Sequence, residues 1–152
     1  MHDHAYLTFG IDATRYAIPA TCVVEIVRAV AVMPLPGAPP IVTGLIDYRG
    51  AILPVFDVAR RFLHPSRPVR AAHRLIIATA GTRTVALHVD EVDRLVELGA
   101  GAVESAPTTL NAAVPVAGLA RTDDGLLVIQ DLDRFLSGAE SRLLDDALAS
   151  AS

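Results

Sequence analysis

The stretch that decides the fold runs from Gly44 to Leu63 and reads GLIDYRGAILPVFDVARRFL. An apolar strand leads into a polar turn that closes on Gly50, a second apolar strand follows, and Asp57 begins a short helical turn. The same order of features returns from Gly118 to Leu136, 74 positions later, as GLARTDDGLLVIQDLDRFL. A unit of this kind present twice in 152 residues predicts two similar small β-domains.

Composition favours short strands over long helices. Hydrophobic residues make up 52% of the chain, which suffices for a core, and ten glycines and ten prolines imply many turns. We therefore expect small closed or partly closed barrels. A second, shorter similarity supports the repeat, because residues 14–18 align with residues 82–86. Residues 99–113 are predicted to form a loop, and residues 139–149 place apolar side chains at helical spacing and predict a terminal helix.

Charge and apolar patterning restrict the partners. The formal net charge is −4, whereas a nucleic-acid-binding protein should present a basic face. The longest apolar run is far shorter than the roughly 20 residues that a membrane span needs. Cys22 is the single cysteine, and no apolar signal segment follows Met1. We expect a cytoplasmic protein that binds no nucleic acid and does not insert into a membrane.

The sequence contains no recognisable catalytic set. The five histidines do not show the spacing of zinc ligands. Cys22 has no nearby histidine that would activate its thiol. A phosphate-binding loop, a nucleophile elbow and a dinucleotide fingerprint are all missing. We therefore predict a binding protein, not an enzyme, without metal or cofactor.

Arg49 is the strongest functional candidate, because it stands at a strand-to-strand turn in apolar surroundings. It is either a solvated turn residue or a guanidinium presented to a partner, whose planar fork can pair with a carboxylate. Asp47 either orients Arg49 or flanks the turn. Glu25 either faces outward from a strand or is an interface charge beside Val23.

The basic region of the chain lies between the two halves. All 13 basic residues are arginines, and this region holds Arg60, Arg61, Arg67, Arg70 and Arg74. Two interpretations are open: a solvated linker, or a surface that meets an acidic partner.

These residues resemble the CheW family, the adaptor proteins of bacterial chemosensory arrays. The resemblance covers about Ala5 to Ala149. It is carried chiefly by residues 44–57, which follow the family pattern of Gly, an apolar pair, Asn-Leu, Arg-Gly, an apolar strand containing Pro, and a closing Asp. The chain departs from that pattern at Asp47 and Tyr48, which replace Asn-Leu.

The resemblance implies a mainly all-β fold of two tandem SH3-like five-stranded β-barrels, with short helices and a C-terminal helix. Residues 1–152 would form a single CheW-like domain. Within it, residues 12–70 would form the first barrel, residues 5–11 and 71–137 the second, and residues 138–152 the helix. Because family members share the first strand across the two halves, the halves are not expected to fold separately.

The resemblance also implies a non-enzymatic adaptor at the membrane-associated receptor array. It would couple the cytoplasmic tips of chemoreceptors (methyl-accepting chemotaxis proteins) to the regulatory domain of the histidine kinase CheA, which binds chiefly the first barrel. The alternative is a scaffold of a non-flagellar pathway with twitching, developmental or second-messenger output. The protein alone would be a monomer, with weak self-assembly in arrays.

Family positions carried over one by one predict two sets of contacts. Arg49 would be the polar anchor of the receptor site, with Val23 and Leu95 as its apolar floor. The full receptor-binding set is Val23, Glu25, Gly44, Asp47, Arg49 and Leu95. The kinase-ring contact would involve Glu104, Thr108 and Thr109, where some family members carry a basic residue and an acidic–aromatic pair.

Overall fold

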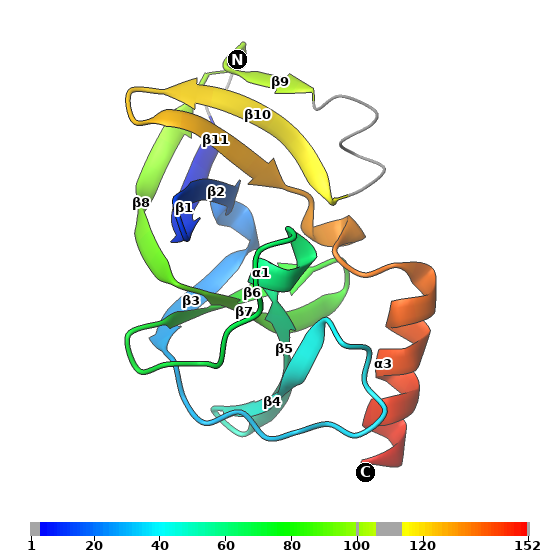
Figure 1. Cartoon of the computed structure of the whole chain (residues 1–152). Coiled ribbons are helices and arrows are strands. Elements are labelled where there is room, and N and C mark those ends of the chain that lie inside the picture. Colours follow the sequence, from blue (N-terminus) through cyan, green and yellow to red (C-terminus); the bar gives the residue numbers. More distant parts are fainter. Residues whose placement is uncertain (1–3, 100, 106–113, 152) are drawn as a thin grey trace.

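The computed structural model describes residues 4–99, 101–105 and 114–151. It contains two β-sheets, one above the other in Figure 1, with a C-terminal helix running beside the lower one. The helical elements are η1 (Ala20–Cys22), α1 (Val58–Arg61), η2 (Leu132–Arg134) and α3 (Gly138–Ser150). The predicted terminal helix is thereby confirmed. The side chain of Ser137 and the side chain of Glu140 cap its start reciprocally.

Sheet A, the upper one, has six strands in the order β8-β1-β2-β11-β10-β9. These are β1 (His4–Ile11), β2 (Thr14–Pro19), β8 (Glu91–Leu98), β9 (Val103–Ser105), β10 (Val116–Thr122) and β11 (Gly125–Gln130). Sheet B has five strands in the order β3-β6-β7-β5-β4. These are β3 (Val23–Arg28), β4 (Val42–Tyr48), β5 (Ala51–Asp57), β6 (Arg74–Ala80) and β7 (Arg83–Val89).

The two sheets share one plan. In sheet A the hairpin β1–β2 meets the hairpin β10–β11 through the parallel pair β2·β11. In sheet B the hairpin β6–β7 meets the hairpin β4–β5 through the parallel pair β7·β5. Strands β8 and β3 occupy the corresponding edges. The prediction of a mainly β protein built from two similar units is confirmed.

The strand pairing corrects the predicted division between the units. Strand β2 was expected in the first barrel but pairs with β1 in sheet A. Strands β6 and β7 were expected in the second barrel but pair with β3 and β5 in sheet B. Each half of the chain therefore places its first hairpin in the sheet completed by the other half. Hairpins form from local sequence, whereas long-range burial decides which hairpins meet.

The predicted loop over residues 99–113 also needs correction, because it contains β9. Val103 to Ser105 pair with β10, and Glu104 lies opposite Leu119. This strand sits on the edge of β10 in the place that Met33 takes on β4, where Met33 and Leu45 form an isolated bridge. A Cβ on Gly44 would lie 2.1 Å from the Met33 carbonyl oxygen, and one on Gly118 would lie 2.8 Å from that of Glu104. The glycine that opens each repeat thus admits a neighbouring backbone.

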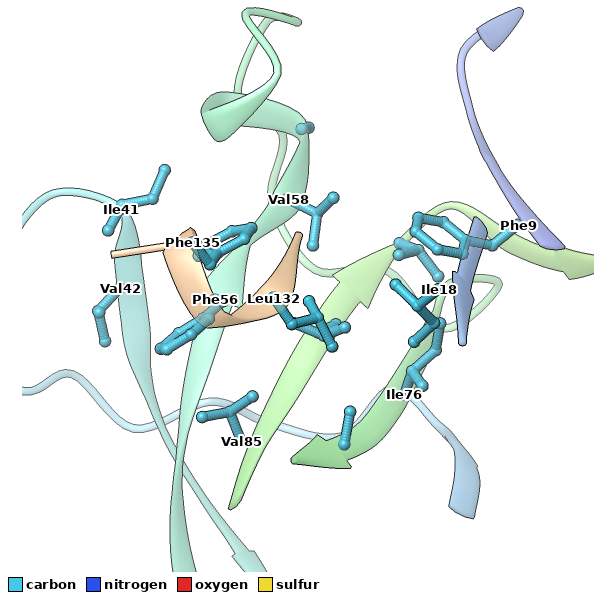
Figure 2. Packing of buried hydrophobic residues seen from close by; sticks show 14 of the residues in the cluster. Phe9, Ile18, Ile41, Val42, Phe56, Val58, Ile76, Val85, Leu132 and Phe135 are labelled. Carbon is cyan, nitrogen blue, oxygen red and sulfur yellow. The ribbon is translucent and has the colours of Figure 1, made fainter. Parts of the chain in front are cut away.

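The largest apolar cluster lies between the two sheets (Figure 2). Phe9 and Ile18 of sheet A and Ile76 of sheet B belong to it. The rings of Phe56 and Phe135 stack within it, with centroids 4.8 Å apart. Smaller clusters fill each sheet separately: Ile46, Leu53, Val55, Leu75, Ile77 and Ala86 in sheet B, and Ala17, Leu98, Ala120, Leu127 and Ile129 in sheet A. Both faces of the central strands are therefore buried.

Within the residues that the structure describes, no helix is long and apolar enough to cross a membrane.

Candidate partner-binding site

Arg49 occupies a tight hairpin turn. Tyr48 and Ala51 form the last pair of the β4–β5 ladder, so Arg49 and Gly50 alone make the turn. Both have positive φ, 52° and 86°, which suits the two-residue turns that follow the right-handed twist of the strands. The Gly50 amide donates to Asp47 Oδ1 at 2.9 Å. Asp47 is therefore a turn-stabilising acid, which decides between its two interpretations.

Glu25, not Asp47, orients the guanidinium. Arg49 Nη2 lies 2.7 Å from Glu25 Oε1, and the Tyr48 hydroxyl donates to that same oxygen. The guanidinium carbon lies 5.2 Å from the centroid of the Tyr48 ring. The Arg49 side chain nevertheless remains 72% exposed. The hydrogen bond to Glu25 is the largest cause that raises the pKa of Tyr48 above its ordinary value.

The contact of Glu25 with Tyr48 and Arg49 joins opposite edges of sheet B. Glu25 lies on β3, at one edge of the strand order, and Tyr48 ends β4, at the other. Side chains at the two edges can meet only if the sheet curls round on itself. The sheet is thus barrel-like, and Arg49 is presented where its two edges come together.

Apolar side chains are exposed on the two edge strands β3 and β8. Val23 is partly buried against the core between the sheets, whereas Leu95, on the edge strand β8 of sheet A, is 63% exposed. Val24 and Ile26 also leave large parts of their side chains exposed. A register shift lies between Val23 and Glu25. Figure 1 shows β8 and β3 on the same side of the molecule, one in each sheet.

The structure thus separates the predicted receptor set. It joins Glu25 to Arg49 and assigns Asp47 to the turn. Gly44 is buried and lies next to the Met33 backbone. Leu95 lies on β8 of sheet A, whereas Arg49 lies in the β4–β5 turn of sheet B. These contact assignments remain predictions.

Sequence reasoning missed Tyr48 as a part of this site, and it did not single out the exposed Val24 and Ile26 on β3. Tyr48 was noted only as a departure from the family pattern, although it precedes Arg49 directly. Val24 and Ile26 flank Glu25, and alternation along a strand should have placed them together on the face opposite to it. The alternation along β3 was visible in the sequence. Its relation to the turn that holds Arg49 could be recognised only once the two edges of sheet B were known.

The predicted kinase-ring residues are described only in part. Glu104 lies exposed on β9, at the edge of sheet A. It borders a hollow of about 370 Å³, whose wall includes Leu119, Arg121 and Leu126. Thr108 and Thr109 lie outside the described residues.

Buried histidines form a pair away from this site. His73 Nδ1 and His88 Nε2 lie 2.8 Å apart, and both residues are buried. Within the part of the chain that the structure describes, no three His, Cys, Asp or Glu side chains are grouped so that they could hold a metal ion.

The model of the CheW-like domain family matches residues 5–140, which is most of the chain. This chain belongs to the CheW-like domain family. The chemotaxis protein CheW of Bacillus subtilis is 27% identical over 138 residues, covering 90% of this chain and 88% of that protein. The chemotaxis protein CheW of Klebsiella aerogenes is 27% identical over 148 residues, covering 95% and 89% respectively.

A solved structure shares the fold over nearly its whole length. The crystal structure of the scaffolding protein TtCheW from Thermoanaerobacter tengcongensis superposes with a TM-score of 0.82 at 26% identity. The match covers 91% of this chain and 96% of that one. The chain is therefore similar, over nearly its whole length, to CheW scaffold proteins.

Proposed function

We propose that this CheW-like protein is a non-enzymatic adaptor that couples the cytoplasmic tips of chemoreceptors to the histidine kinase CheA. The observation that carries the proposal is the state of Arg49: held by Glu25 and Tyr48, yet 72% exposed. A guanidinium fixed in advance loses little conformational freedom when a partner binds. This is the arrangement expected of an interface anchor.

Receptor binding would use the charge and the apolar surface together. Glu25 contacts one terminal nitrogen of Arg49, which leaves other N–H groups of the planar fork to donate to a receptor carboxylate or carbonyl. Val24, Ile26 and Leu95 supply exposed apolar area on the two edge strands. Burying this apolar area against a receptor would add to the binding free energy.

The kinase would bind elsewhere on the same molecule. Its regulatory domain is proposed to contact the barrel formed by sheet B, and the ring contact is proposed at β9, with Glu104 and residues Thr108 and Thr109. Separate surfaces let one adaptor touch a receptor and a kinase at once. Individually weak contacts then gain strength through multivalency in an array. Flagellar and non-flagellar outputs both lie downstream of the kinase, so these contacts would serve either.

The first experiment measures binding of the purified protein to a receptor cytoplasmic fragment and to the kinase regulatory domain. Arg49→Ala should weaken receptor binding about tenfold or more, because it removes the anchor, and should leave kinase binding unchanged. Arg142→Ala is the matched control, since Arg142 is an exposed arginine on α3. If the unmodified protein binds neither partner, the proposal is wrong. If Arg49→Ala and Arg142→Ala behave alike, the receptor-site assignment is wrong.

A further inference from the structure

The candidate receptor residues lie on strands that follow the points where the chain passes between the two sheets. Strand β2 of sheet A leads into β3 of sheet B through η1, and β7 of sheet B leads into β8 of sheet A through the single residue Asp90. Both receiving strands carry members of the predicted receptor set, because β3 begins with Val23 and β8 contains Leu95. The position of Leu95 relative to Val23 therefore depends on the angle between the sheets.

Asp90 is tied to the neighbouring turn of sheet A. Its amide donates to the Gly10 carbonyl at 3.2 Å, and its Oδ2 accepts from the Asp12 amide at 2.9 Å. Its Oδ1 is buried and has no hydrogen-bond partner among the described residues, although His73 Nε2 lies 3.9 Å away. A carboxylate in this position needs a compensating positive charge close by.

Arg67 supplies that charge from the linker between the halves. Its Nη1 donates to Asp90 Oδ2 at 2.8 Å, and its two terminal nitrogens donate to the two oxygens of Asp12 at 3.0 Å each. This bidentate geometry is stronger and more directional than a single hydrogen bond. The Arg67 side chain is only 16% exposed. Arg67 is therefore neither a solvated linker residue nor available to an acidic partner.

The same linker is anchored in the core between the sheets. His64 Nδ1 lies 3.1 Å from Asp12 Oδ2, and His64 Nε2 lies 2.6 Å from the hydroxyl of Tyr16. Tyr16 is buried and belongs to the cluster between the sheets. The linker joins β5 and β6, which both lie in sheet B, yet residues 64–67 contact the β1–β2 turn of sheet A. It thus crosses the boundary between the sheets. The contacts that hold it there form an inter-sheet brace of Asp12, His64, Arg67 and Asp90.

We propose that the inter-sheet brace sets the angle between the sheets and so positions Leu95 relative to Val23 for receptor binding. This role rests on the proposed function, and none of the four brace residues belongs to the predicted receptor set. Charge-assisted hydrogen bonds would hold the site in its binding-competent geometry before a receptor arrives. When the brace is broken, that geometry is populated only part of the time, and the apparent affinity falls by the same fraction.

The test compares Asp12→Asn with Asp123→Asn. Asparagine tolerates the positive φ of 53° at position 12, so the substitution weakens the brace without straining the turn. Asp123→Asn is the matched control, because it removes the same charge from the exposed β10–β11 turn of the same sheet. Asp12→Asn should weaken binding to a receptor cytoplasmic fragment about three- to tenfold in isothermal titration, and leave binding to the kinase regulatory domain unchanged. Asp123→Asn should change neither affinity.

A double variant tests whether the brace acts as a unit. Arg67→Gln removes the other side of the same contact. The variant Asp12→Asn/Arg67→Gln should therefore lose little more receptor affinity than either single variant, since substitutions within one network are not additive. Losses that multiply would mean that the two residues act separately and would overturn the brace.

A direct measurement of the angle separates positioning from a general loss of stability. Spin labels attached at Thr43→Cys on β4 and Glu97→Cys on β8, in a Cys22→Ala background, report the distance between the sheets by pulsed electron paramagnetic resonance. Both labelled positions are exposed. Asp12→Asn should shift or broaden the distance distribution, whereas Asp123→Asn should leave it unchanged.

Failure of this role and failure of the proposed function give different results. If the unmodified protein does not bind the receptor fragment, the proposed function is wrong and the positioning role falls with it. If the unmodified protein binds and Asp12→Asn binds equally well, only the positioning role is wrong. An unchanged distance distribution in Asp12→Asn would also overturn it. If Asp12→Asn does not fold, Arg67→Lys takes its place, because it keeps the charge but loses the planar fork, and it should show the same two effects.

Discussion

At the scale of single residues, Glu25 governs the candidate receptor site. One of its oxygens accepts from both Tyr48 and Arg49, so the position of the guanidinium depends on a three-residue network. Arg49 itself was predictable from the sequence, because a lone arginine before a turn glycine is conspicuous. Its partner Glu25 was not predictable, because Glu25 lies on β3 and Arg49 lies in the turn after β4, and these two strands are not neighbours in the sheet.

The substitution Tyr48→Phe tests this network. It removes the hydroxyl that fixes Glu25 but keeps the ring beneath Arg49. We expect receptor affinity to fall about two- to fivefold, equivalent to roughly 0.5–1 kcal/mol for one hydrogen bond, with kinase binding unchanged. Isothermal titration against the receptor fragment measures it. An effect as large as that of Arg49→Ala would show that Tyr48 contacts the receptor itself.

At the scale of elements, the opening glycine of each repeat determines which backbone can lie against β4 and β10. Glycine-leucine was recognisable as a strand signal, but its physical purpose required the structure. Gly44 admits the Met33 carbonyl, and Gly118 admits the Glu104 carbonyl. The strand β9 was not predicted, because three residues within a loop are too few to show the alternation of apolar and polar side chains that indicates a strand.

Gly44→Ala should therefore destabilise the protein. The new Cβ would stand 2.1 Å from a backbone oxygen, so the segment that holds Met33 must move. We expect a loss of about 1–3 kcal/mol in the free energy of unfolding, measured by urea denaturation. Gly101→Ala is the control, because a Cβ there has no heavy atom within 4 Å. Equal stability of the two variants would contradict this account of the repeat.

His73, which follows the linker between the halves, and His88 on β7 form a buried pair. The Arg70 amide donates to His73 Nδ1, so that nitrogen carries no proton and His88 Nε2–H must be the donor in the bond between the rings. Burial first, and then the neighbouring His73, lowers the pKa of His88 below its ordinary value. Other charged groups near His88 are Asp57, Asp90 and Arg67.

A lowered histidine pKa predicts loss of stability in mild acid. Below the ordinary pKa of about 6.5, His88 binds a proton in the unfolded chain but stays unprotonated in the folded chain. The free energy of unfolding therefore falls as pH drops. We expect a slope of up to about 1.4 kcal/mol per pH unit from this one proton as pH falls below about 6.5. Urea titrations of the protein and of His88→Asn measure it. The slope should flatten in the variant, and an unchanged slope would assign the effect to other groups.

At the scale of the whole molecule, the two sheets are interdependent. Sheet B takes β6 and β7 from the second half of the chain, and sheet A takes β1 and β2 from the first. The largest apolar cluster lies between the sheets, and α3 covers it with Leu144 and Ala147. Two similar units were predictable from the repeat, but their exchange of hairpins was not, because a repeat says nothing about which copy pairs with which.

Residues 1–72 expressed alone should therefore not fold. This fragment retains β3, β4 and β5 but lacks the two strands that lie between β3 and β5 in sheet B. We expect no native-like dispersion in its proton–nitrogen NMR spectrum. Adding residues 73–152 should produce a dispersed spectrum, because β6 and β7 can then pair with β3 and β5. A fragment that folds by itself would mean that sheet B can close without β6 and β7.

The sequence by itself determined the mainly β class, the duplicated hairpin unit, the terminal helix and the position of an arginine in the turn. Each of these depends on interactions within about twenty residues, such as turn glycines, strand alternation and capping side chains. Only the tertiary structure decided the exchange of hairpins, the pairing of Glu25 with Arg49, and the ion pairs of the linker arginines Arg61 and Arg67. Those features depend on which distant surfaces bury each other, and local pattern carries no information about that choice.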